Sequence, residues 1–320
     1  MKNCVYIYKS THVIIDIYIS TYNSTSDSLR RSYELFLGCT IPARQPSYEL
    51  ASRKALEKLG IELVDLDKTT CGAPPPIESV DVKTSLAIAA YNISLAEELD
   101  LDIVTLCNGC FQSLAKANAL LKEEEHLKDE INGILAKTGR KFRGNWEVKH
   151  YLQVLVNDVG LAEIKKNMAK TLDNLRVAPF YGCHVLRPSS LLKFDDVERP
   201  KVLDDLIEAT GAKSVYYRNK LKCCGGLLRG YEDDLALEIA REKVMNISKA
   251  KADCVVTVCP FCFVALDMGQ FQMRSKFNEA YEIPVLHYPE LLCLSLGVDA
   301  KDLALGTHRT KVDSLLEKIK

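Results

Sequence analysis

The sequence has no excess of charge of either sign and no long apolar run. Its 42 Lys and Arg residues nearly balance 43 Asp and Glu residues, and the formal net charge is −1. This balance argues against a nucleic-acid-binding surface and against an acidic tail. The apolar stretch VIIDIYI at residues 13–19 is interrupted by Asp16 and is much shorter than the ~20 apolar residues of a membrane helix. We therefore expect no nucleic-acid partner and no membrane span.

Two sequence signals are also missing. No small-residue cleavage site follows the apolar stretch, so there is no convincing secretory signal. No glycine fingerprint for a flavin precedes a predicted helix, so electrons for any redox reaction would arrive through partner proteins. The 12 cysteines are then better explained by metal binding or redox chemistry inside a cell than by a disulfide framework. We expect a cytoplasmic protein.

The length of 320 residues suits about two domains with sizeable cores. Residues 1–32, which include the polar linker TYNSTSDS and Cys4, are expected to form an N-terminal extension outside the functional unit, with Cys4 as a surface thiol. The remainder is expected to form one domain at residues 33–160 and a second at residues 161–320.

The expected domains share an internal repeat. Six elements recur in the same order: a strand ending in Gly-Cys, a helix, a Cys-Gly turn, a second helix, a strand entering Cys-x-x-Cys, and a closing His-Tyr phrase. Because so many elements recur in order, we interpret the chain as a duplicated unit. The most similar pairs are ELFLGCTIPAR at 34–44 with APFYGCHVLRP at 178–188, TTCGAP at 69–74 with KCCGGL at 222–227, DIVTLCNGC at 102–110 with CVVTVCPFC at 254–262, and VKHY at 148–151 with VLHY at 285–288.

Apolar strands alternate with amphipathic helices in both halves, which predicts an α/β fold of two pseudo-symmetric βαβαβ units, each with a parallel sheet. One cysteine follows each of three successive strands. The carboxyl ends of parallel strands share one edge, where open α/β sheets bind ligands, so cysteines far apart in sequence should converge there. The first half contributes Cys39, Cys71, Cys107 and Cys110, and the second half contributes Cys183, Cys224, Cys259 and Cys262.

The second half has a further cysteine, Cys223, directly before Cys224. Adjacent Cα atoms lie about 3.8 Å apart, below the roughly 4.4–6.8 Å of unstrained disulfides. Both sulfurs are therefore expected to point at one metal or metal–sulfur centre, with the following glycines allowing close approach. A structural zinc takes four ligands, so a fifth thiol favours an iron–sulfur cluster. The first half has Thr70 in place of Cys223, and its four thiols suit either a four-iron cluster or a structural zinc.

This doubled cysteine pattern resembles the cysteine-rich CCG domain, and it is most similar to the B subunit of heterodisulfide reductase from methanogenic archaea. FLGC, CNGCF, YGCH, CPFC and PVLHY carry the resemblance, which covers about residues 33–320. It implies two Rossmann-like domains, each holding a noncubane [4Fe–4S] cluster, with the mixed disulfide of coenzyme M and coenzyme B reduced between them. It also implies two partners of the same reductase, its small [4Fe–4S] protein (the C subunit) and its flavoprotein (the A subunit). Carried over, Cys183, Cys223, Cys224, Cys259 and Cys262 ligate the second cluster, and Cys39, Cys71, Cys107 and Cys110 supply the first.

The chain departs from the family pattern at two positions. Thr70 replaces the first cysteine of the pair in the first half, and Phe263 stands where the family tends to have a histidine. The first-half centre is therefore left open between a cubane cluster, a noncubane cluster and zinc.

Several other side chains are either candidates for a functional role or are explained by structure and packing. His184 is a candidate proton or hydrogen-bond donor to a nascent thiolate, and Arg44 and Arg187 are candidate partners for anionic groups of a substrate. A structural role is favoured for His150 and His287, and core positions for Cys254 and Cys293.

These observations lead to one expected function and two alternatives. The expected function is that of the catalytic iron–sulfur subunit of a reductase acting on the coenzyme M–coenzyme B heterodisulfide. The first alternative is an electron-transfer subunit of another oxidoreductase, such as those associated with glycolate, lactate or succinate dehydrogenases. The second is a zinc-stabilised scaffold without turnover.

Overall fold

The computed structural model describes residues 31–72 and 74–319. Most of the expected N-terminal extension, including Cys4, lies outside these residues. The first strand, β1 (Arg31–Phe36), begins two residues before the expected start of the first domain. None of the helices in the described ranges combines the length and the apolar character that crossing a membrane requires.

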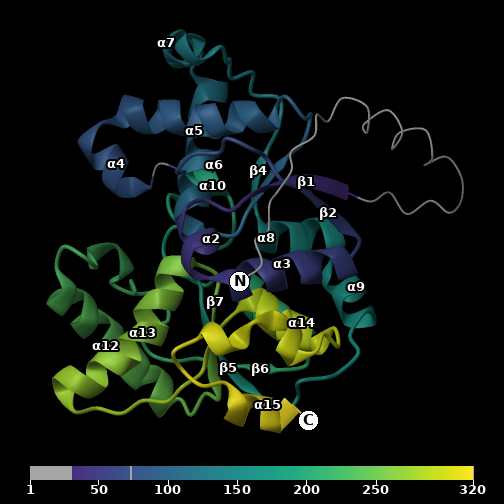
Figure 1. Ribbon diagram of the computed structural model, residues 1–320, viewed down its shortest axis with the longest axis vertical. Helices are drawn as coiled ribbons and strands as arrows, with labels where there is room; N and C mark the ends of the chain where they lie inside the picture. Colours follow the sequence, from purple (N-terminus) through teal and green to yellow (C-terminus); the bar gives the residue numbers. More distant parts are fainter. Residues whose placement is uncertain (1–30, 73, 320) are drawn as a thin grey trace, which may run out of the picture. The chain divides into compact units, whose positions relative to one another are not determined.

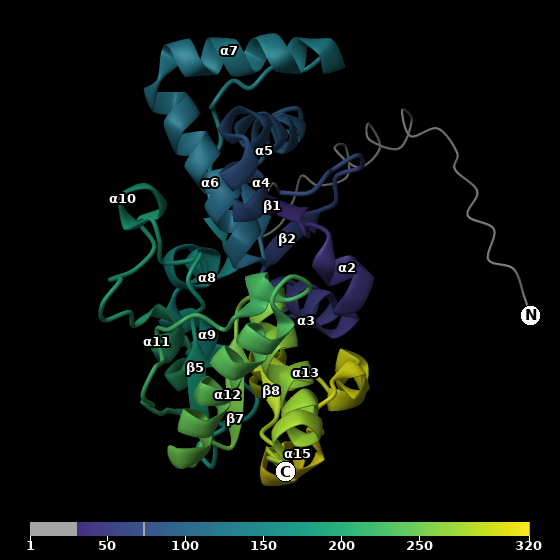
Figure 2. The same ribbon diagram turned by 90° about the vertical axis from the view of Figure 1, so that its left-hand side faces the viewer.

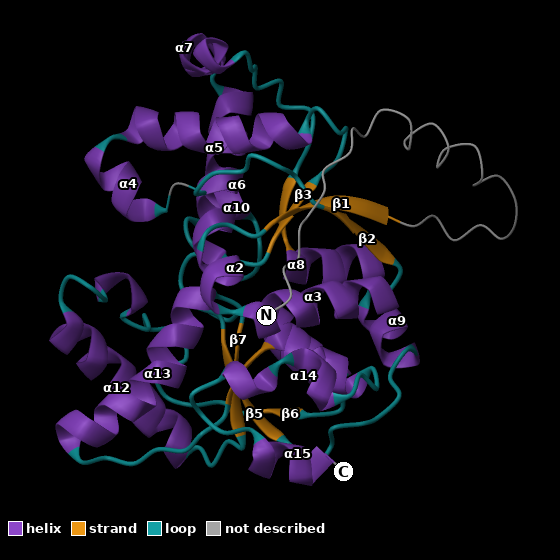
Figure 3. Ribbon diagram, viewed as in Figure 1, coloured by secondary structure: helices purple, strands orange, loops and turns teal. Residues whose placement is uncertain are grey.

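Two four-stranded parallel sheets form the framework, and they confirm the predicted α/β fold of two similar halves (Figures 1 and 3). The strand order is β2-β1-β3-β4 in the first sheet and β6-β5-β7-β8 in the second. The fourth strand of each sheet was not part of the predicted βαβαβ unit, and it is formed by the closing His-Tyr phrase. The strands are β1, β2 (Ile61–Val64), β3 (Ile103–Thr105), β4 (Val148–His150), β5 (Arg176–Phe180), β6 (Lys213–Ser214), β7 (Cys254–Thr257) and β8 (Val285–His287).

Helices connect the parallel strands. In the first half they are α2 (Thr40–Arg44), α3 (Pro46–Lys58), α4 (Pro75–Val80), α5 (Val82–Ala96), α6 (Asn108–Glu123) and α7 (Glu125–Leu135), with the short η1 (Ala136–Thr138). Along the chain, β4 and β5 are connected by α8 (Tyr151–Gln153), the π-helix η2 (Val154–Val159) and α9 (Leu161–Lys166). The second half has α10 (Ser189–Leu192), α11 (Val202–Ala209), η3 (Gly226–Leu228), α12 (Asp233–Lys249), α13 (Pro260–Phe277), α14 (Tyr288–Ser295), η4 (Ala300–Leu303), η5 (Leu305–Thr307) and α15 (Asp313–Ile319).

In the second sheet, β5, β7 and β8 are buried on both faces because helices cover each side, whereas the edge strand β6 is partly exposed. On one face Ala178 and Phe180 of β5 pack in a cluster with α12 and α13, which run side by side in Figure 2. On the other face Val177 belongs to a core that is continuous with the first half. Cys254 and Cys293 are both fully buried, which confirms their predicted core positions.

The two halves share a buried join formed mainly by α3 and α14. The Tyr48 ring of α3 stacks on His287 with 3.6 Å between centroids, and His287 stacks in turn on Phe263 at 4.4 Å. Cys293 donates from Sγ to the carbonyl oxygen of Ala51 at 3.2 Å. His150 and His287 occupy equivalent N-terminal caps, of α8 and α14. These caps agree with the structural role that the sequence favours for both histidines.

Candidate metal centre

The cysteines follow strand ends at the edge where each sheet reverses its order. Cys39 comes after β1 and Cys107 after β3, and these two strands are neighbours in the first sheet. Cys183 and Cys259 follow β5 and β7, which are neighbours in the second. The chain segments that follow these neighbouring strands run in opposite directions from the sheet. A crevice that can bind a ligand therefore forms at the carboxyl ends of the strands.

All five cysteines that the sequence assigns to the second centre line one pocket of about 30 Å³. Leu227 and Phe261 provide apolar walls, and Asn108 and Gly109 enter from the first half. We call these five residues the second-half set: Cys183, Cys223, Cys224, Cys259 and Cys262.

The glycines after the adjacent pair allow backbone N–H groups to reach the sulfurs. Gly225 donates its N–H to Cys223 Sγ at 3.3 Å, and Gly226 donates to Cys224 Sγ at 3.2 Å. Gly225 has φ +78°, a left-handed conformation that glycine adopts at little cost. A Cβ on Gly226 would lie 3.1 Å from Cys224 Sγ. Hydrogen bonds to sulfur stabilise thiolate charge, and they are among the features that set cluster potentials.

In the first half, two loops close around Cys110. A Cβ on Gly38 would lie 2.9 Å from Cys110 Sγ, and one on Gly72 would lie 3.0 Å from it. These glycines flank Cys39 and Cys71, so the structure brings the loops of both cysteines to Cys110. Gly182 repeats the arrangement beside Cys262 Sγ, at 3.1 Å. We call Cys39, Cys71, Cys107 and Cys110 the first-half set.

The two sets meet at Cys107 and Cys259. The pKa of the Cys107 thiol is raised well above its ordinary value by hydrogen bonds with Cys110 and Cys259 and by burial. The pKa of Cys259 is lowered because it accepts hydrogen bonds from Cys107 and Cys262. Both sets therefore border the same buried join.

Each Cys-x-x-Cys segment is also held by the opposite half. Gln45 donates from Nε2 to the carbonyl oxygen of Pro260 at 2.8 Å. Asn108 donates from Nδ2 to the carbonyl oxygen of Tyr181 at 2.6 Å. Both bonds run from a first-half side chain to a second-half carbonyl, and they tie the two Cys-x-x-Cys segments to the opposite halves.

The donor chemistry of the second-half set fits an iron–sulfur cluster. Thiolate sulfur is the usual ligand of such clusters, and five thiols exceed the four positions of a structural zinc. The first-half set has four thiols, a number that suits either a cluster or a zinc ion. No three His, Cys, Asp or Glu side chains within the described ranges are arranged around a single metal-ion site.

The structure shows the contacts of Thr70 and Phe263, the two residues that depart from the family pattern. Thr70 receives a hydrogen bond to its Oγ1 from Asn92 Nδ2 at 3.1 Å, and its N–H donates to Asn92 Oδ1 at 2.8 Å. Its hydroxyl is therefore bound to α5. Phe263 packs in the aromatic join against His287 and against the edge of His308, at 4.9 Å.

Of the candidates His184, Arg44 and Arg187, the first two line pockets together with cysteines, whereas the side chain of Arg187 is bound elsewhere although its N–H donates to the carbonyl oxygen of Cys183 at 3.1 Å. His184 lines the pocket of the second-half set, and burial lowers its pKa. Arg44 lines a groove of about 450 Å³ together with Cys39. Arg187 instead donates to the carbonyl oxygen of Val197 at 3.3 Å and lies 3.8 Å from the carboxylate of Glu198.

Arg229 lines the same groove as Arg44 and was missed by the sequence reasoning. It donates to Gln272 Oε1 at 2.9 Å. The groove passes from Cys39, the residue before α2, to Gly226, whose N–H donates to Cys224 Sγ. No repeat or motif marks Arg229, because the groove forms only when α2 and α13 pack together.

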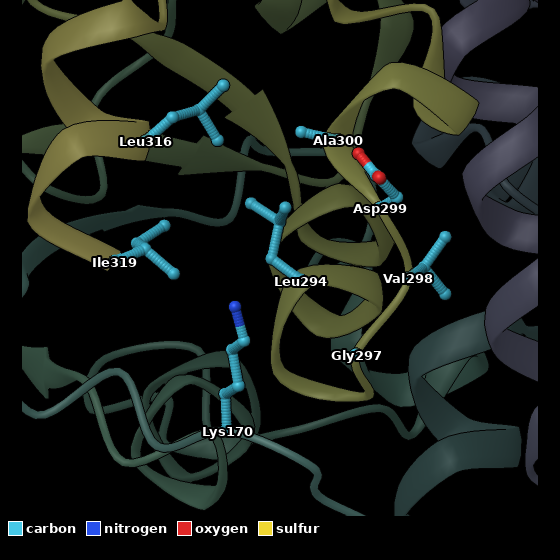
Figure 4. Close-up of a pocket in the computed structure, with 8 residues that line it drawn as sticks. All are labelled: Lys170, Leu294, Gly297, Val298, Asp299, Ala300, Leu316 and Ile319. Atoms are coloured by element: carbon cyan, nitrogen blue, oxygen red, sulfur yellow. The ribbon is translucent and has the colours of Figure 1, made fainter.

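A different pocket, of about 370 Å³, lies away from the cysteines and is lined by Leu294, Leu316 and Ile319 (Figure 4). Lys170 extends into it from below in the figure, and Asp299 lies at its side. Its lining contains neither thiol nor imidazole, so the chemistry of the cysteines takes place elsewhere.

Comparison with known proteins places this geometry in a family. The model of the CCG cysteine-rich domain matches twice, over residues 33–115 and 177–267. The chain is 42% identical over 289 residues to the B subunit of the ferredoxin:CoB-CoM heterodisulfide reductase of Methanosarcina mazei, covering 89% of this chain and 96% of that one. It is 34% identical over 282 residues to the 8-methylmenaquinol:fumarate reductase membrane anchor subunit of Wolinella succinogenes, covering 87% and 96%.

A solved structure of a hypothetical protein from Helicobacter pylori has the same fold. Its TM-score is 0.71 at 16% identity, and the match covers 93% of this chain and 57% of that one. The repeat, the paired sheets, the cysteine sets and these relatives agree. The chain belongs to the family of heterodisulfide reductase B subunits, which are oxidoreductase components built from two cysteine-rich CCG domains.

Proposed function

We propose that this chain is the disulfide-reducing iron–sulfur subunit of a heterodisulfide reductase that acts on the mixed disulfide of coenzyme M and coenzyme B. One disulfide, two electrons and two protons would give two thiols. The observation that carries the proposal is the meeting of the two cysteine sets at Cys107 and Cys259, together with a groove lined by Cys39 of the first-half set and by Gly226 and Phe261 of the second half. A small disulfide in that groove would be within reach of both sets.

The residues of the groove suit an anionic substrate. Arg44 and Arg229 lie along it, and Asp233 is a further charged residue of its lining. Guanidinium groups bind carboxylate, sulfonate or phosphate oxygens through two parallel hydrogen bonds. We therefore propose that Arg44 and Arg229 orient the substrate, with His184 near enough to the second-half set to donate a hydrogen bond to a product thiolate.

The cofactors follow from the donor sets. We propose that the domain at residues 161–320 holds a noncubane [4Fe–4S] cluster on the second-half set. The domain at residues 33–160 would hold a separate centre on the first-half set. Such clusters supply electrons one at a time to the two-electron reduction. The electrons would reach the protein through the [4Fe–4S] protein and the flavoprotein of the same reductase (its C and A subunits), in the cytoplasm, where thiols stay reduced.

A second candidate function is electron transfer to or from a quinone within another oxidoreductase. The 34% identity to a subunit of an 8-methylmenaquinol:fumarate reductase favours it. It needs the same cysteine sets but no binding of a disulfide in the groove.

The test is an assay of anaerobically purified protein with a reduced viologen dye as electron donor. The proposal predicts release of two thiols per heterodisulfide, and Arg44→Gln and Arg229→Gln should raise KM more than they lower kcat. Quinone reduction without thiol release would establish the second candidate. One zinc per half without acid-labile sulfide would establish the scaffold.

A further inference from the structure

Lys243 is a buried cation that the proposed reaction does not use. It lies in α12, and only 1% of its surface is exposed. Its ammonium donates to the carbonyl oxygen of Asn219 at 2.6 Å. Lysine is almost never fully buried without a partner of opposite charge, because removing an ammonium from water is costly. In the described part of the chain, Lys243 forms no ion pair with a carboxylate, so its counter-charge has to come from another source.

The surroundings of the ammonium show where that counter-charge lies. The Lys243 nitrogen sits over the Phe180 ring, 4.2 Å from its centroid, and 5.7 Å from that of Tyr217. These contacts are favourable in a desolvated site, but they supply less than the removal of an ammonium from water costs. Phe180 and Tyr217 belong to the same buried cluster as Cys224 and Cys262. The thiols of Cys224, Cys262 and Cys223 act to raise the pKa of the ammonium, in that order, against the larger, lowering effect of burial.

The first half provides an internal comparison. The sequence Asn-Ile-Ser occurs at residues 92–94 in α5 and at residues 246–248 in α12. Aligned on it, the buried positions agree over the central segments 86–93 and 240–247, and Ala89 corresponds to Lys243. Thr70 corresponds in the same way to Cys223. The half with the fifth thiol therefore also has the buried cation, and among the residues described in the other half there is neither a fifth thiol in the set nor a buried Lys or Arg.

We propose that Lys243 is the buried counter-charge of the centre on the second-half set, and that it raises the reduction potential of this centre. A fixed positive charge in a low-dielectric interior stabilises the reduced state, which carries one more negative charge, more than it stabilises the oxidised state. Lys243 acts through the centre as a tuning residue and touches no substrate. The inference rests on the proposed iron–sulfur centre of the second half.

Two substitutions separate the charge of Lys243 from its shape and hydrogen bond. Lys243→Met keeps the apolar stem beside Phe180, and Lys243→Gln keeps a donor for the Asn219 carbonyl. Lys222→Met is the matched control, because Lys222 is next to Cys223 in sequence but its side chain is 65% exposed. Water and salt screen an exposed charge of this kind.

The measurement is a reductive titration of the anaerobically purified protein followed by electron paramagnetic resonance. Lys243→Met and Lys243→Gln should both shift the midpoint potential of the second-half centre to more negative values. Lys222→Met should leave it unchanged, and no variant should shift the first-half centre. An intact centre with wild-type potential in Lys243→Gln would overturn the inference. Absence of iron and sulfide from the wild type would instead overturn the proposed centre itself.

If neither Lys243 variant assembles a centre, the iron-free proteins decide the matter. Without an anionic centre the buried ammonium is uncompensated, so removing it should raise or preserve the melting temperature of the iron-free protein. A lower melting temperature in both iron-free variants would show that Lys243 is needed for the fold alone, and the inference would be wrong.

Discussion

Glu34 places a carboxyl group in the middle of the first sheet, where it should make stability depend on pH. It lies on β1, is fully buried, and has no hydrogen-bond partner for either carboxyl oxygen among the described residues. Burial, and then the nearby charge of Asp65, raise its pKa from 4.5 to about 8. The folded protein therefore favours the neutral acid, and it has to hold a proton that the unfolded chain releases above about pH 4.5.

The magnitude follows from these two pKa values. The difference between 4.5 and about 8 corresponds to about 5 kcal/mol once both states are ionised, and to about 3 kcal/mol at pH 7. Because the folded pKa is raised, this stability is fully present below pH 4.5 and is lost as the pH rises towards 8. Glu34→Gln keeps the shape of the side chain and removes the ionisation. Its free energy of unfolding should match the wild type near pH 4.5 and exceed it by about 3 kcal/mol at pH 7.

The assay is urea unfolding of the iron-free, reduced protein at several pH values between 4.5 and 8. Thiols and histidines titrate equally in both proteins, so the difference between the curves isolates Glu34. Glu62→Gln on the exposed side of β2 is the control, since its charge is already in water. A wild-type and a Glu34→Gln curve that stay parallel across this range would refute the reasoning.

Three further predictions concern the cysteine sets. Cys223→Ser and Cys224→Ser should each alter the cluster spectrum and abolish disulfide reduction, whereas Cys293→Ser, in the core at the join, should do neither; equal tolerance at all three positions would show that the pair does not bind the centre. Thr70→Cys should make the spectra of the two halves more alike by restoring a fifth thiol beside Cys71, and unchanged spectra and metal content would contradict this account of Thr70. Gly182→Ala should lower the iron content and destabilise the protein by more than the roughly 1–2 kcal/mol of left-handed strain, because its Cβ would lie 2.7 Å from Asn108 Nδ2. Gly139→Ala is the control for the strain alone, since Gly139 has φ +73° and a Cβ there would have nothing within 4 Å. Equal losses of stability from both substitutions would show that the contact with Asn108 is unimportant.

The repeated pattern was sufficient to predict the α/β class and the two similar halves, because alternating strands and helices are local signals. It also predicted that Cys183 and Cys259 would approach each other, since the carboxyl ends of parallel strands share an edge. The fourth strands were missed because Val148–His150 and Val285–His287 are too short for a clear periodicity.

Contacts between distant segments could not be predicted in the same way. Arg229 reaches the groove of Arg44 only through the packing of α2 on α13. The segment 194–199 is irregular, and the contact of Phe194 with the rings of Phe111 and His150 depends on the tertiary fold. The side chain of Arg187 is bound to Val197 and Glu198, a contact that also depends on the tertiary fold.

The crossed hydrogen bonds at the join have an evolutionary consequence. Gln45 of the first half supports Pro260, and Asn108 supports Tyr181 of the second half. A single ancestral domain could obtain both kinds of support only by pairing with another copy of itself. Once the copies were fused, each could change in ways that suited only its neighbour, as Thr70 and Cys223 now illustrate. The two halves have become complementary, and separating them would remove both hydrogen bonds that tie the Cys-x-x-Cys segments across the join.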